Sequence, residues 1–127
     1  PYMGAGMNAS ARDLAKFGLM LMNNGTFNNT QIVPESWIKW TLEESAEYKN
    51  IFSKSEYGLR LPDFHYKNQV WVGGPEIMIC IGIYGQAIYV DQNNKVVIVK
   101  LSSHPEPDDP LILGNTFLGI AALAENI

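Results

Sequence analysis

The sequence predicts an α+β fold in which helices come first, an antiparallel sheet follows and a last helix packs on that sheet. Three runs rich in Ile, Val and Tyr lie at 77–83, 86–91 and 95–101, and such runs favour strands. Apolar residues at helical spacing fill 14–22, which predicts an amphipathic helix. The uncharged apolar stretch 111–124 is too short to span a bilayer and predicts a buried helix instead.

Composition limits the classes of function. The chain has 127 residues, 46% of them hydrophobic and 17% charged, which fits one globular domain. Its net charge of -4 argues against nucleic acid as a partner. One cysteine, Cys80, and two histidines give neither a disulfide framework nor a metal cluster, so we expect no metal and no cofactor. Because the first residue is Pro1, we expect a longer or processed protein.

Two helices are expected ahead of the sheet. Ser10 and Asp13 form a capping-box-like pair at the start of the first helix, and Gly25 ends it. Pro34 suits the first turn of a second helix that continues to about residue 42. The polar, mixed-charge stretch 43–55 predicts a solvated helix end and a surface loop.

The remaining connections follow from turn residues and short apolar runs. We expect loops at 1–8 and 62–68 and short strands at 57–61 and 69–72. A connector at 102–109 precedes the last helix, which Asp109-Pro110 starts.

The last strand carries an expectation about partners. Residues 96–99 are apolar without alternation, as in a strand covered on both faces. At the end of a meander this strand would leave one edge open, and the last helix would lack cover on its second face. We therefore expect either the missing N-terminal part of the same protein or self-association through the edge from Val96 to Leu101.

One segment needs a functional explanation. Gly82 and Gly85 interrupt a strand-like run, and glycine there is costly unless the backbone bends or another group approaches closely. The sequence therefore places a candidate site at this bend.

Four segments carry a family resemblance. Residues 5–18, A-G-M-N-A-S-A-R-D-L-A-K-F-G, resemble the G-G-x-x-x-S-A-x-D-L-A-x-F-G segment of the β-lactamase-related, penicillin-recognising serine hydrolases. This group includes class C β-lactamases, DD-peptidases, esterases and 6-aminohexanoate-dimer hydrolases. Residues 31–37 are similar to the element that follows there. Residues 82–91 resemble the G-x-x-G-Q-x-x-Y-V-D-P strand pair of the esterase and dimer-hydrolase branch, and 96–103 resemble its Ser-Ser strand.

The resemblance implies a fold and a division of the chain. Residues 1–127 would be the C-terminal portion of a β-lactamase/transpeptidase-like domain, with 1–56 from its all-helical lobe and 57–127 forming strands and the C-terminal helix. The family's Ser-x-x-Lys nucleophile and its tyrosine motif would lie upstream. Ser36 and Lys39 have this spacing, but they fall on an ordinary helix. The chain alone is therefore expected to be inactive.

The resemblance also implies site residues. Cys80, Ile81 and Gly82 take the places of Lys-Thr-Gly in β-lactamases, and the backbone N–H of Ile83 would be half of an oxyanion hole. The loss of the lysine and threonine points to esters or amides rather than β-lactams. The residues expected to contact substrate are Cys80, Ile81, Tyr84 and Gly85.

Two alternatives remain open. The scaffold could serve as a non-catalytic binding module, or the chain could be an independent small domain that self-associates. For the other candidates we expect structural roles: a backbone hydrogen bond for Gln86, surface positions for His65 and His104, and packing on the sheet for Tyr57 and Trp71.

Overall fold

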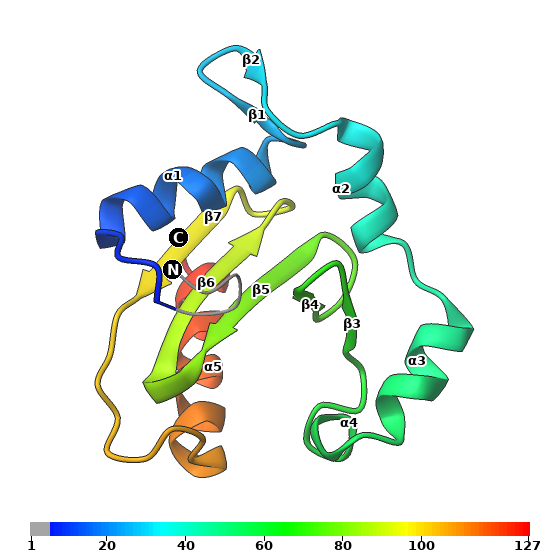
Figure 1. The fold of residues 1–127 in the computed structure, drawn as a ribbon, viewed down its shortest axis with the longest axis vertical. Helices are drawn as coiled ribbons and strands as arrows, with labels where there is room; N and C mark the ends of the chain where they lie inside the picture. Colours follow the sequence, from blue (N-terminus) through cyan, green and yellow to red (C-terminus); the bar gives the residue numbers. More distant parts are fainter. Residues whose placement is uncertain (1–5) are drawn as a thin grey trace.

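The computed structural model describes residues 6–127, apart from the side chain of Arg60, and has three layers. Helix α1 (Ala11–Met22) covers one face of a five-stranded sheet and helix α5 (Pro110–Glu125) covers the other (Figure 1). This arrangement confirms the predicted α+β class. Most of the loop expected at 1–8 lies outside the described residues.

The sheet is an antiparallel meander. Its strands are β3 (His65–Lys67), β4 (Val70–Val72), β5 (Ile77–Gly82), β6 (Gln86–Asp91) and β7 (Val96–Lys100), and they lie in this order in space. Every neighbouring pair is antiparallel. A separate hairpin, β1 (Thr26–Phe27) with β2 (Thr30–Gln31), follows α1. The three predicted strands and the short strand near residue 70 are therefore confirmed.

Alternation along β5, β6 and β7 divides the core in two, because successive side chains of a strand point to opposite faces. One face packs against α1 and α2 (Glu35–Leu42) through Met78, Cys80, Ile88, Val90, Val97 and Val99. The other face packs against α5 through Ile79, Ile81, Ala87, Tyr89, Val96 and Ile98. Strand β7 thus contacts both cores, which explains its unbroken apolar run, although it is the last strand of the sheet.

Helix α1 forms where the capping signals placed it. Ser10 Oγ accepts a hydrogen bond from the N–H of Asp13 at 3.2 Å, and Gly25, with a φ of 84°, ends the turn that follows. Gly18 sits where α1 meets the sheet: a β-carbon there would lie 2.5 Å from Cγ1 of Val97. This close approach seats the helix on β7.

Helix α5 begins at the predicted residue, with Asp109 Oδ1 accepting from the N–H groups of Leu111 and Ile112 at 2.9 and 3.0 Å. The second face of the helix lacks cover in this chain, as the sequence predicted. Only Ile120 and Ala124 are buried, whereas Leu118 is 72% exposed, because this sheet reaches one side of the helix. Within 6–127, no helix is long and apolar enough to cross a membrane.

The segment between α2 and β3 differs from the prediction. Stretch 43–55 contains helix α3 (Ala46–Ser53), and the strand expected at 57–61 is helix α4 (Glu56–Arg60). Ser45 and Ser55 cap these helices by accepting from the N–H groups of Tyr48 and Gly58. These two serine caps are the sequence signal that would have predicted both helices.

Strand β3 corrects a second expectation, since its residues were predicted to lie in a loop. His65 pairs with Val72 across the strands and is only 1% exposed, so the surface position expected for it is wrong. Its ring contacts the Thr41 backbone, whereas Nε2 has no hydrogen-bond partner among residues 6–127.

Candidate functional site

The bend between β5 and β6 is a three-residue turn, Ile83–Gly85. Tyr84 has a left-handed backbone (φ 60°, ψ 25°), and Gly85 follows with a φ of 83°. A non-glycine residue in this region is held there by its surroundings at a cost of about 1–3 kcal/mol. Ile83 is the first residue of the turn, and its side chain is 67% exposed.

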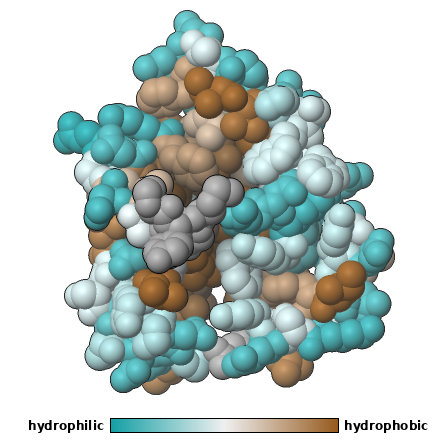
Figure 2. Space-filling view, in the orientation of Figure 1, coloured by the Kyte–Doolittle hydropathy of each residue, from teal (hydrophilic) through white to brown (hydrophobic). Residues whose placement is uncertain are grey.

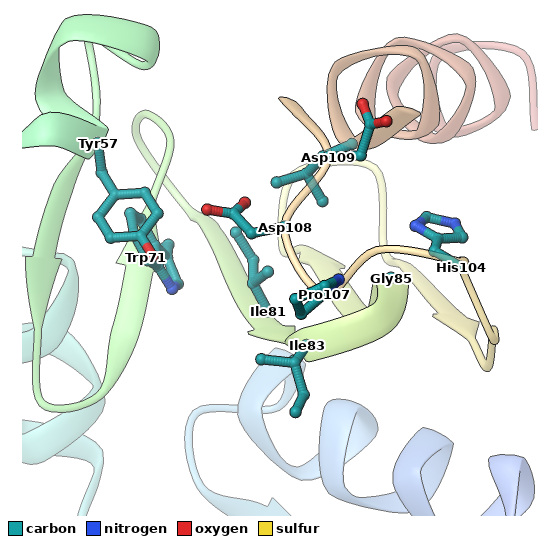
Figure 3. A pocket seen from close by; sticks show the side chains of 11 residues that line it. Tyr57, Trp71, Ile81, Ile83, Gly85, His104, Pro107, Asp108 and Asp109 are labelled. Carbon is teal, nitrogen blue, oxygen red and sulfur yellow. The ribbon is translucent and has the colours of Figure 1, made fainter. Parts of the chain in front are cut away.

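Two cavities meet at the end of β5. The smaller one, about 110 Å³, has Ile83, Gly85 and His104 in its wall and is closed on one side by Tyr57 and Trp71 (Figure 3). The larger one, about 430 Å³, lies on the face that carries α1 and includes Cys80 and Gln86. Ile81 and Gly82 line both cavities. The end of β5 is therefore backbone that can be reached from two sides.

Trp71 is the centre of an aromatic wall on the smaller cavity. The rings of Phe52, Tyr57 and Tyr66 contact it edge-on, with centroid distances of 5.7, 5.0 and 5.1 Å. Tyr57 reaches this place from α4 and Trp71 from β4 (Figure 3). Edge-on packing fixes both rings, so the packing expected of them also shapes the cavity.

The connector after β7 holds the bend from one side. Tyr84 donates its N–H to the carbonyl of Pro107 at 3.0 Å and accepts from the N–H of His104 at 3.1 Å. Lys100 Nζ donates to the carbonyl of Gly85 at 3.1 Å and lies 2.9 Å from His104 Nε2. An ammonium group only donates, so Nε2 is the acceptor.

Both glycines of the bend face side chains of this chain. A β-carbon on Gly85 would lie 2.2 Å from Cε1 of His104, and one on Gly82 would lie 3.0 Å from Cβ of Gln86. The space expected for substrate at these two α-carbons is thus partly filled. His104 was expected at the surface, but it is half-buried against the bend, and no sequence signal pointed to this contact.

The predicted substrate residues are not all brought together. Cys80 points toward the α1 face and Ile81 toward the α5 face, as alternation requires. Tyr84 lines neither cavity and is 42% exposed. Gln86 bonds backbone, as expected: its amide accepts from the N–H of Ser102 at 3.0 Å and donates to the carbonyl of the same residue.

The structure activates neither Cys80 nor Ser36, the serine of the Ser-x-x-Lys spacing, as a nucleophile. Burial raises the pKa of the Cys80 thiol to about 11, so the reactive thiolate is scarce at neutral pH. Lys39 forms an ion pair with Glu35 at 2.8 Å and is exposed, as is Ser36. A lysine turned to solvent does not activate a serine. Among the described residues, His, Cys, Asp and Glu form no group of three that could hold a metal ion.

The chain is related to the β-lactamase-like serine hydrolases. The particular relatives are 6-aminohexanoate-dimer hydrolases. The chain is 31% identical over 109 residues to the enzyme of that name from Paenarthrobacter ureafaciens, with 84% of this chain and 27% of the relative aligned. No protein-family model matches the chain.

A solved structure supports the same relationship. A protein from Bacillus anthracis that is assigned the same name superposes with a TM-score of 0.65 and 35% identity, over 97% of this chain and 31% of that one. The chain therefore spans about a third or less of the length of these relatives.

Proposed function

We propose that this chain supplies the oxyanion strand of a serine hydrolase that cleaves esters or amides through an acyl-enzyme. The observation that carries the proposal is the position of Ile83, which begins a fixed turn, lines the smaller cavity and directly follows Ile81 and Gly82, the two residues that line both cavities. A backbone donor held in place stabilises the oxyanion of the tetrahedral intermediate whatever the side chain. In this proposal the nucleophile comes from polypeptide outside these residues.

The substrate class follows from the residues before the donor. Cys80 and Ile81 offer neither a cation nor a hydroxyl to a β-lactam carboxylate. The larger cavity beside them is mainly apolar, with Met7, Leu14 and Ile88 in its wall. We therefore favour an ester or amide with an apolar acyl group and no carboxylate at that place. Cephalosporin hydrolysis far faster than that of simple esters would contradict this assignment.

The decisive variant is Ile83→Pro in the polypeptide made from the complete reading frame. Proline removes the N–H but suits the first position of a turn, and the extended backbone of Gly82 (φ -113°, ψ 156°) can precede it. We expect kcat for a p-nitrophenyl ester to fall about 10²–10³-fold. Ile83→Val keeps the N–H and serves as the matched control. A proline variant that folds and retains wild-type kcat would remove Ile83 from the mechanism.

Self-association or docking is the second candidate, and the open edge of β7 favours it. Strand β7 is the last of the sheet, Leu101 beside it is 52% exposed, and apolar surface also lies open between α1 and α2 (Figure 2). An unpaired edge is a template for another strand. A self-associating domain would give a discrete oligomer of the 127-residue chain in light scattering. A non-catalytic binding module would show no labelling by a serine-reactive fluorophosphonate in the complete polypeptide. A monomeric chain would count against self-association.

A further inference from the structure

We infer that Gln86 is a positioning residue, whose side chain holds the Ile83–Gly85 turn in the orientation that aims the Ile83 N–H. This inference rests on the proposed function. Gln86 is the first residue of β6 and pairs with Gly82 across the bend, so it stands at the base of the turn. Its side chain lies over the α-carbon of Gly82.

Gln86 joins the turn to the connector by two hydrogen bonds with one residue. Its Oε1 accepts the Ser102 N–H at 3.0 Å, and its Nε2 donates to the Ser102 carbonyl. A side-chain amide that uses both ends on one backbone residue reproduces the pairing of a strand neighbour. The sheet is thereby extended past the end of β7, which stops at Lys100.

The connector fixed at Ser102 then holds Tyr84 at both of its backbone polar groups. The His104 N–H bonds the Tyr84 carbonyl at 3.1 Å, and the Pro107 carbonyl accepts the Tyr84 N–H at 3.0 Å. These two bonds maintain the left-handed conformation of Tyr84, which an L-residue otherwise disfavours. The direction of the neighbouring peptides, including that of Ile83, depends on this conformation.

Substitutions of Gln86 can separate this positioning role from a general contribution to stability. Gln86→Met keeps the length of the side chain and removes both hydrogen bonds, while Gln86→Glu keeps the acceptor and loses the donor. The matched control is Gln92→Met. Gln92 also bonds backbone, donating to the Leu21 carbonyl at 2.9 Å, but it lies beyond the opposite end of β6.

The experiment uses the polypeptide made from the complete reading frame. In Gln86→Met we expect amide exchange of Tyr84 and His104 to become at least about tenfold faster. We expect kcat for a p-nitrophenyl ester to fall about tenfold to a hundredfold, with KM changed by less than about twofold. The kcat and the exchange rates of Gln86→Glu should lie between those of wild type and those of Gln86→Met. Gln92→Met should lose comparable stability and keep both kcat and the exchange rates at the bend.

Each outcome decides the inference. Unchanged exchange at Tyr84 and His104 in Gln86→Met would overturn it. Faster exchange with unchanged kcat would show that Gln86 holds the turn without positioning the donor, and this also overturns it. If the wild-type polypeptide hydrolyses no ester or amide, the proposed function fails, and the exchange rates alone decide whether Gln86 holds the turn.

Discussion

The imidazole of His104 lies directly on the α-carbon of Gly85, where a β-carbon would come within 2.2 Å of Cε1 and 2.5 Å of Nδ1. The same ring is tied to the bend through Lys100, which also donates to the Gly85 carbonyl. Glycine is therefore required at position 85 for two reasons: the His104 ring leaves no room for a β-carbon, and the backbone has a positive φ.

Gly85→Ala should lower the free energy of unfolding by about 2–4 kcal/mol, since it combines overpacking with a strained backbone. The double variant Gly85→Ala with His104→Ala removes the clash but keeps the positive φ. Relative to His104→Ala, the added alanine should cost only about 1–2 kcal/mol. Urea unfolding of all four proteins measures both costs. An equal cost in the two backgrounds would show that the ring does not restrict Gly85.

Cys80 should resist alkylation in the folded chain. Burial raises the pKa of its thiol from 9.0 to about 11, which lowers the thiolate fraction at neutral pH by about a hundredfold. Iodoacetamide labelling, followed by mass spectrometry, should therefore be about a hundredfold slower than in urea-unfolded chain. Cys80→Ser provides the unlabelled control. Labelling at equal rates in the folded and unfolded states would contradict this assignment.

Local signals in the sequence predicted much of the fold. Ser10, Pro34 and Asp109 placed three helix starts, because capping depends on residues a few positions apart. The Ile- and Val-rich runs at 86–91 and 95–101 placed the last hairpin, and in the structure Asp91 Oδ1 accepts the Asn94 N–H at 2.9 Å in the turn between them. These features need no long-range contact, and the sequence alone is sufficient for them.

The errors have two causes. The strand expected at 57–61 is helix α4, whose local cap at Ser55 was overlooked, whereas His65 is buried because β3 pairs with β4, a contact that no local pattern shows. The packing of His104 on Gly85 joins two turns of the chain that no local pattern connects. The bend itself could be predicted from its glycines, but the residues that occupy the space beside them could not.

Acid should destabilise the chain through His65. Burial lowers the pKa of His65 below its ordinary 6.5, and Lys49 and Lys67 add to this, while the Thr41 backbone and Glu44 oppose it. The unfolded chain therefore takes up this proton at higher pH than the folded one. The contribution of His65 to the free energy of unfolding is complete above pH 6.5 and is lost as the pH falls toward the lowered folded-state pKa.

Urea unfolding at about pH 7.5 and about pH 5 measures this loss. His65→Gln removes the titrating group, so its stability should fall less between the two pH values than that of wild type. The comparison cancels the contributions of the groups that both proteins share. A wild-type chain with the same pH dependence as His65→Gln would show that His65 titrates equally in both states.

Two helical glycines should respond to alanine in opposite directions. At Gly18 a β-carbon would lie 2.5 Å from Val97 Cγ1 and 3.3 Å from Ile88 Cγ2, whereas at Gly114 in α5 nothing lies within 4 Å. Gly114→Ala should therefore stabilise the chain by about 0.5–1 kcal/mol through helix propensity alone. Gly18→Ala gains the same propensity, but overpacking against β7 should outweigh it and leave a net loss of about 1–2 kcal/mol. Thermal and urea unfolding of the two variants measure the difference, and a stabilising Gly18→Ala would mean that α1 is not seated on β7 at this glycine.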